Sequence, residues 1–192
     1  MSQRKPQTHI SVAEYLAGER ESDVRHEYVE GEVYALAGAS DRHNRIALNI
    51  ASTLNNHIAD GPCEVFMSDM KIKVAPDVFY YPDVVVVTCD AAGGDAYFRA
   101  EPRLIVEVIS SSTERIDRHE KMMAYKSVPS LQEYVLVSQD EMRAEVYKRT
   151  GSEWEVQIFT GAEEQVRFES VELYMSMKEI YRNVRLPETD AG

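Results

Sequence analysis

The chain has 192 residues, a length typical of one domain, and its 44% apolar and 28% charged residues are ordinary for a soluble globular protein. No run approaches the roughly 18 consecutive apolar residues of a membrane span, and the basic N-terminus lacks the apolar stretch of a secretory signal, so we expect a cytoplasmic protein. The net charge of −12 argues against tight autonomous binding to duplex DNA unless basic side chains are concentrated locally, because phosphate contacts supply much of such affinity.

The first third of the chain is predicted to form two helices with a hairpin between them. Residues 9–20 indicate a short helix that begins with a capping box of Ser11 and Glu14. Residues 26–36 alternate polar and apolar side chains around a Glu-Gly pair, which predicts a hairpin. Apolar side chains at helical spacing then predict a longer helix over 42–58.

The middle of the chain is predicted to supply the sheet. Residues 63–74 alternate apolar and polar side chains and form the first strand candidate. Residues 83–87 (DVVVV) and 103–109 (RLIVEVI) are continuous β-branched runs, typical of strands buried on both faces. A helix over 112–127 follows, opened by a Ser-Glu capping box, and residues 133–137 form another strand.

The last third is predicted to form an antiparallel meander from the runs 143–149, 154–159 and 165–168, followed by a short helix capped by Ser176 and Glu179. The meander carries more apolar surface than a peripheral hairpin needs, which favours packing against a twofold mate in a homodimer. The side chains concerned are Val146, Trp154, Val156, Ile158 and Phe159.

We find no repeat, low-complexity tract or linker that divides the chain. A single domain over 1–192 is therefore predicted, with a core at about 11–160 and a frayed tail from 187. The order of elements predicts an α/β (α+β) fold: a mixed β-sheet core flanked by helices, with an N-terminal hairpin and a C-terminal antiparallel meander. Cys63 and Cys89 form no CxxC pair, which fits buried thiols in a reducing compartment.

Glu107 lies in the middle of an otherwise interior strand. A buried carboxylate costs several kcal/mol unless a basic side chain, a metal ion or the open end of a sheet compensates it. An edge strand with a solvent-facing Glu107, or a structural salt bridge, is the alternative. Asp83 stands at the start of the second buried run, behind a proline, and Asp after Pro is often only a turn residue. Two carboxylates at comparable places on adjacent strands, however, are suited to Mg²⁺ or Mn²⁺.

Three further positions are candidates for the same site. Asp117, Lys121 and Tyr125 are spaced i, i+4, i+8 and form one polar row on a helix. This row is either a solvated face with an ordinary ion pair or a means of bringing Lys121 to Glu107. His43 begins an inward-facing stripe and is either a core histidine or a ligand or base.

Several segments resemble the Uma2 family, and together they cover about residues 11–160. They are residues 30–34 (EGEVY), 37–40 (AGAS) with His43, 81–86 (YPDVVV), 105–110 (IVEVIS), 111–113 (SST), Asp117, Lys121, Tyr125 and 129–134 (PSLQEY). The resemblance implies the restriction-endonuclease-like fold of the PD-(D/E)XK superfamily. It also implies that Asp83 and Glu107, with the Val108 carbonyl, hold a divalent cation that activates water against a phosphodiester.

The sequence departs from the superfamily pattern at Ile109, where a lysine is usual. The resemblance suggests that Lys121 has taken over this role, stabilising charge in the transition state. If it has not, the site binds metal without cutting.

The leading hypothesis is therefore a Mg²⁺- or Mn²⁺-dependent endonuclease that hydrolyses nucleic acid, with Asp83, Glu107 and Lys121 as catalytic residues. Additional candidates are His43, Asp69, Asp117 and Tyr125, and a basic cleft could be lined by Lys71, Lys73, Arg115, Arg118 and Lys126. The main alternative is a catalytically inactive module that binds nucleic acid or a protein partner. A hydrolase of a small phosphorylated substrate fits the acidic charge but lacks a glycine-rich phosphate loop.

Overall fold

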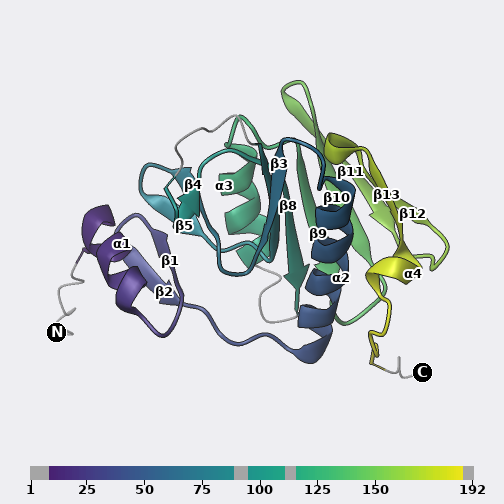
Figure 1. Cartoon of the computed structure of the whole chain (residues 1–192), viewed down its shortest axis with the longest axis horizontal. Coiled ribbons are helices and arrows are strands. Elements are labelled where there is room, and N and C mark those ends of the chain that lie inside the picture. The colour runs from purple at the N-terminus through teal and green to yellow at the C-terminus, as the bar shows by residue number, and fades with distance from the viewer. Residues whose placement is uncertain (1–8, 89–94, 111–115, 188–192) are drawn as a thin grey trace, which may run out of the picture.

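The structure is a computed structural model that describes residues 9–88, 95–110 and 116–187, with only the backbone of residues 88, 116 and 117. Within these ranges the chain forms a six-stranded mixed sheet, a five-stranded sheet and a two-stranded sheet (Figure 1). None of the described helices has the length and apolar character needed to cross a lipid bilayer. Cys63 is a free thiol, and Cys89 lies outside the described residues.

The N-terminal elements form as the sequence predicts. Helix α1 (Val12–Glu21) begins at Ser11, whose hydroxyl accepts from the Glu14 N–H at 3.3 Å while the Glu14 carboxylate accepts from the Ser11 N–H at 2.9 Å. Strands β1 (His26–Val29) and β2 (Glu32–Ala35) form the hairpin. Its two turn residues, Glu30 and Gly31, both have positive φ, at 48° and 94°, as a tight hairpin turn of this hand requires.

The five-stranded sheet has the order β2-β1-β5-β4-β7. Its remaining strands are β4 (Lys71–Ala75), β5 (Val78–Tyr80) and β7 (Phe98–Arg99). Helix α1 packs against it through aromatic side chains, with the rings of Tyr15 and Tyr28 stacked 4.8 Å apart beside Phe79. This sheet lies at the α1 end of the molecule (Figure 1).

The strand predicted over 63–74 is wrong, because this segment forms two strands in different sheets. Strand β3 (Cys63–Met67) joins the six-stranded sheet, and β4 joins the five-stranded one. Between them Ser68 has a φ of 54°, so the chain turns there and cannot continue as one extended strand. Because apolar and polar side chains alternate on both sides of Ser68, the sequence pattern did not show that the strand is interrupted there.

The six-stranded sheet has the order β11-β10-β9-β8-β6-β3 and positions the candidate site. Strands β8 and β9 are parallel, and the other neighbours are antiparallel. The strands not yet given are β6 (Val84–Thr88), β8 (Pro102–Ile109), β9 (Glu133–Ser138), β10 (Ala144–Thr150) and β11 (Glu153–Phe159). Helix α2 (Asp41–His57) runs along one face of this sheet (Figure 1), where Ile46, Ile50 and Leu54 are fully buried.

The other face of the six-stranded sheet packs against helix α3 (Met122–Lys126) and the five-stranded sheet. A π-helical segment, η1 (Ile116–Lys121), leads into α3, whereas the capping box predicted for this helix falls outside the described residues. Tyr125 of α3 is fully buried between Ile72 and Tyr80 of the smaller sheet and Val85 and Ile105 of the larger one. Helix α3, which directly follows Lys121, is therefore held between two sheets.

The C-terminal part departs from the predicted meander. Strand β12 (Gln165–Phe168) pairs with β13 (Leu173–Ser176), not with β11, because a 3-10 turn, η2 (Glu169–Val171), reverses the chain. Helix α4 (Met177–Ile180) follows with its predicted capping box. The core extends to Tyr181, beyond the predicted limit near residue 160, and the tail after Pro187 lies outside the described residues.

Candidate active site

Asp83 and Glu107 lie side by side at one end of the six-stranded sheet. Strands β6 and β8 are antiparallel, with Val84 opposite Val106. Asp83, the residue before β6, therefore stands beside Glu107, and side chains at opposite positions of such a pair share a face. The Asp83 N–H donates to Glu107 Oε2 at 3.3 Å, and Asp83 Oδ2 accepts from the Val108 N–H at 2.7 Å.

Lys121 supplies a positive charge to this pair of carboxylates. Its Nζ lies 3.3 Å from Glu107 Oε1, inside the range of about 6 Å over which opposite charges strongly affect each other's ionisation. The same Nζ lies 2.9 Å from Glu27 Oε1, and the Lys121 side chain is only 9% exposed. Lys121 thus points into the molecule and not into solvent. The side chain of Asp117, its predicted helical partner, lies outside the described residues.

Tyr125 is a second donor to Glu107. Its hydroxyl donates to Glu107 Oε1 at 3.0 Å, and its side chain is fully buried. Burial raises the pKa of Tyr125 well above its ordinary value, and the negative charge of Glu107 raises it further. Tyr125 therefore stays protonated and keeps donating throughout the physiological pH range. Lys121 and Tyr125 together fix one oxygen of Glu107.

A cleft of about 740 Å³ opens onto these groups. It is lined by Arg25, Leu36–Ser40, Arg42, His43, Asn44, Ala47, Ser68, Asp69, Tyr81, Asp83, Glu107, Val108, Ser110, Lys121, Gln139 and Asp140. His43, from the first turn of α2, places its Nε2 3.2 Å from Asp83 Oδ2. Asp69 also lines the cleft, but its exposed carboxylate forms an ion pair with Arg25 at 2.5 Å. His43 is thus placed to act at the candidate site, while Asp69 lies at its rim.

The basic residues predicted to line a cleft are not those that do so. Lys71 and Lys73 belong to β4, where Lys71 Nζ donates to a tyrosine hydroxyl at 3.0 Å and Lys73 lies over a phenylalanine ring. Lys126 lies over a tryptophan ring, and Arg118 pairs with a glutamate of β10 at 2.6 Å. Arg115 lies outside the described residues. Sequence spacing alone could not show that these four described side chains already contact other parts of the fold.

Sequence reasoning missed three charged residues of the site: Glu27, Arg25 and Arg42. Glu27 is buried and contacts Lys121, which is 94 positions later in the chain. Arg25 and Arg42 line the cleft, where they form ion pairs with Asp69 and Asp140. A glutamate in an alternating hairpin is usually solvent-facing, so the sequence carried no signal for the burial of Glu27. Nothing in the spacing of Arg25 and Arg42, whose side chains remain 50% and 31% exposed, placed them at the cleft.

The described residues contain no group of three or more His, Cys, Asp and Glu side chains arranged to hold a metal ion. The set around Asp83 is smaller, with two carboxylates and the backbone of Val108. Mg²⁺ commonly takes one or two carboxylates and fills its other positions with water and substrate phosphate. No described residue donates a hydrogen bond to Asp83 Oδ1, so this oxygen can serve as a ligand. The hard oxygen donors thus fit this cation.

Paired carboxylates at adjacent strand ends, with an inward lysine, on a mixed sheet flanked by helices define a restriction-endonuclease-like protein. The chain belongs to the Uma2 family, which is described as "Putative restriction endonuclease". The model of this family matches residues 12–177. The predicted family and fold class are thereby confirmed.

The comparisons match this chain to proteins of Synechocystis and Anabaena. Two Synechocystis proteins, the uncharacterized proteins sll1609 and slr1290, are each 34% identical to this chain. The first match covers 83% of this chain and 92% of the relative, and the second covers 91% and 93%. A crystal structure of a "putative nuclease belonging to DUF820" from Anabaena variabilis matches with a TM-score of 0.73 and 19% identity, over 90% of this chain and 97% of that one. The structural match shows a shared fold.

Proposed function

We propose that this chain is a metal-dependent endonuclease that hydrolyses phosphodiester bonds in nucleic acid. The observation that carries the proposal is the position of Lys121. Its ammonium lies 3.3 Å from Glu107 although Ile109 occupies the usual lysine position. Lys121, from the helical segment after the strand of Glu107, thus supplies the positive charge that Ile109 cannot.

Asp83, Glu107 and the Val108 carbonyl would hold Mg²⁺ or Mn²⁺. Such a cation supplies a water of lowered pKa and neutralises charge that develops on the phosphodiester. The protein's part is to fix the ligands in advance: the Val108 N–H holds one oxygen of Asp83 at 2.7 Å. Lys121 and Tyr125 hold one oxygen of Glu107 at 3.3 and 3.0 Å. Ligands fixed in this way need little reorganisation when substrate binds.

Lys121 is the group proposed to stabilise the transition state. Its buried side chain lines the cleft, and its ammonium lies within 3.3 Å of both Glu27 and Glu107. A positive charge in a site largely screened from water is worth more than the same charge in solvent. His43, 3.2 Å from Asp83, can orient that carboxylate or accept a proton from the attacking water.

Cleavage assays with single- and double-stranded DNA and RNA, in Mg²⁺, Mn²⁺ and EDTA, test the proposal. We expect metal-dependent cleavage that Asp83→Asn abolishes and that Lys121→Ala lowers about a hundredfold or more. Lys121→Arg should restore little, because a planar guanidinium does not reproduce a compact point charge. Lys126→Ala is the matched control, since it removes a nearby lysine of α3 whose ammonium lies over the Trp154 ring outside the cleft.

The alternative is a module that binds nucleic acid or a protein without cutting. Glu27 favours it, because its carboxylate lies 2.9 Å from the Lys121 ammonium and neutralises part of the charge that catalysis needs. Metal binding by calorimetry without cleavage of any of the four nucleic acids would support this alternative. Cleavage that persists in EDTA or in Asp83→Asn would contradict the proposed site.

A further inference from the structure

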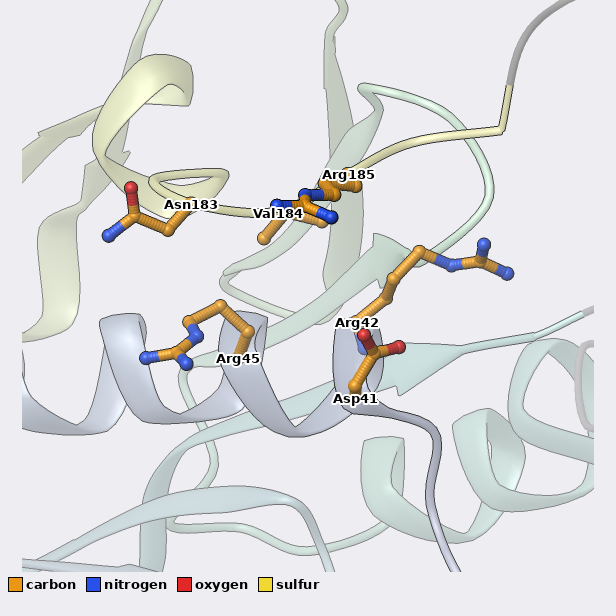
Figure 2. Close-up of a pocket in the computed structure, with 6 residues that line it drawn as sticks. All are labelled: Asp41, Arg42, Arg45, Asn183, Val184 and Arg185. Atoms are coloured by element: carbon orange, nitrogen blue, oxygen red, sulfur yellow. The ribbon is translucent and has the colours of Figure 1, made fainter.

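A second pocket lies next to the cleft, between the first turns of α2 and the segment that follows α4 (Figure 2). It has a volume of about 240 Å³ and is lined by Asp41, Arg42, Arg45, Asn183, Val184 and Arg185. Three of these six side chains are guanidinium groups and one is a carboxylate. This local excess of positive charge occurs in a chain whose formal net charge is −12.

Two of the three arginines of this pocket have no acidic partner among the described residues. Within the described ranges, neither Arg45 nor Arg185 forms a side-chain hydrogen bond or an ion pair, and both are exposed. No described residue accepts a hydrogen bond from the buried Nε of Arg42. The exposed guanidinium groups of Arg45 and Arg185 are therefore available to a ligand that supplies acceptors.

Arg42 connects the pocket with the candidate active site. It lines both the 240 Å³ pocket and the 740 Å³ cleft that holds Asp83 and Glu107. One of its terminal nitrogens pairs at 3.2 Å with Oδ1 of Asp140, which also lines the cleft. A ligand that extends out of the cleft past Arg42 would therefore meet Arg45 and Arg185 next.

The three guanidinium groups are spread out. In Figure 2 those of Arg42 and Arg45 extend from helix α2 to opposite sides, and Arg185 lies across the pocket from the helix. Such a row suits successive phosphates along a strand better than one small anion, because guanidinium groups bind phosphate oxygens in a fixed planar geometry. The first turn of the 17-residue helix α2 adds partial positive charge to the same place.

We propose that this pocket binds the backbone phosphates of a nucleic-acid strand next to the bond that is cut. The inference rests on the proposed function, because the strand enters the pocket from the cleft. It assigns the phosphate contacts to Arg45 and Arg185, with Arg42 at the junction, and not to the basic side chains of β4 and α3. The acidic remainder of the surface then limits binding elsewhere on the molecule.

Oligonucleotide affinity is the direct test, measured by fluorescence anisotropy in the Asp83→Asn variant so that no cutting intervenes. Arg45→Ala with Arg185→Ala should weaken binding about tenfold or more and lower the slope of log K against log salt by about 1.5, since each phosphate contact contributes about 0.7–0.9. Arg42 is not substituted in this test, because it also lines the cleft. Arg20→Ala is the control at a distant site: it removes one guanidinium group from helix α1, at the other end of the molecule (Figure 1).

The outcomes separate this inference from the proposed function. Unchanged affinity and salt slope in the double variant, or a similar loss in Arg20→Ala, would overturn the inference while leaving any metal-dependent cleavage intact. Failure of the parent protein to bind any oligonucleotide would overturn it as well. Arginine-dependent binding without cleavage by the protein that retains Asp83 would support the pocket and reject the nuclease proposal.

Discussion

Lys121 is a buried cation shared by two carboxylates that lie far apart in the sequence. Glu107 was expected to need a compensating charge because it interrupts an apolar strand, and a lysine on the next helix could reach it. Glu107 could therefore be singled out from its predicted burial, whereas the approach of Lys121 was one of two alternatives for its helical row and rested on the family resemblance. Glu27 could not be singled out, since one glutamate in a four-residue strand carries no sign of burial, and its contact with Lys121 exists only after the hairpin packs beside α3.

At the residue scale, Tyr125→Phe tests how the site holds Glu107. The change removes a hydroxyl that donates to Glu107 Oε1 at 3.0 Å and keeps the ring that fills the core. We expect about 1–3 kcal/mol lower stability in urea unfolding, as for a lost hydrogen bond to a charged group. Metal affinity or cleavage rate should fall about tenfold, as for other groups that orient metal ligands.

Tyr147→Phe is the control for this prediction. Its hydroxyl also donates to a carboxylate, Glu145 Oε2 at 2.8 Å, but outside the cleft. It should lower stability by a similar amount without changing metal affinity. Equal metal affinity in Tyr125→Phe and the parent protein would show that Glu107 does not depend on this donor.

At the element scale, the fold could be predicted where local signals agree. Capping boxes at α1 and α4, the Glu-Gly hairpin turn and the β-branched runs of β6 and β8 each define an element from neighbouring residues. The pairing of elements was not accessible in the same way. The turn at Ser68 and the choice of β13 as the partner of β12 are settled by long-range packing.

The segment that carries Lys121 is anchored to the sheet by Glu145 of β10. Burial alone would raise the pKa of Glu145, but hydrogen bonds from Arg118, Arg143 and Tyr147 outweigh it and lower the pKa to about 2. Arg118 belongs to η1, so its contact at 2.6 Å ties this segment to β10, the neighbour of the edge strand β11. Arg118 thus has a structural explanation, in place of the phosphate-binding role predicted for it.

This anchor predicts a pH dependence of stability. The folded-state pKa of Glu145 lies below its unfolded value of about 4.3, so its contribution is complete above that value and is lost as pH falls from about 4.3 to about 2. Glu145→Gln should lower the unfolding free energy at neutral pH and reduce its fall over that acid range. Glu153→Gln, at an exposed position, should do neither. If the unfolding free energies of Glu145→Gln and the parent protein fell in parallel over that acid range, the prediction would be contradicted.

On the scale of the whole molecule, each of the two larger sheets supplies part of the candidate site. The six-stranded sheet supplies Asp83 and Glu107, and the five-stranded sheet supplies Glu27, so the site forms where they approach each other around α3. Excess negative charge elsewhere does not exclude nucleic-acid binding, because the field near the site depends on the nearby arginines. The β11 edge of the six-stranded sheet lies away from the five-stranded sheet (Figure 1).

The apolar face of that edge leads to the last prediction, that the chain forms a homodimer through β11. Trp154, Val156 and Ile158 alternate along this edge strand and so share one face. Val156 and Ile158 are 52% and 48% exposed, an unusual placement for β-branched apolar side chains on an open edge. Light scattering should give a dimer for the parent protein and a monomer for Ile158→Lys, because a buried unpaired ammonium opposes association. Tyr174→Lys, which alters an equally exposed apolar side chain on β13, should remain dimeric. A monomeric parent protein would remove the basis of the prediction, and a dimer that survives Ile158→Lys would place the interface on another surface.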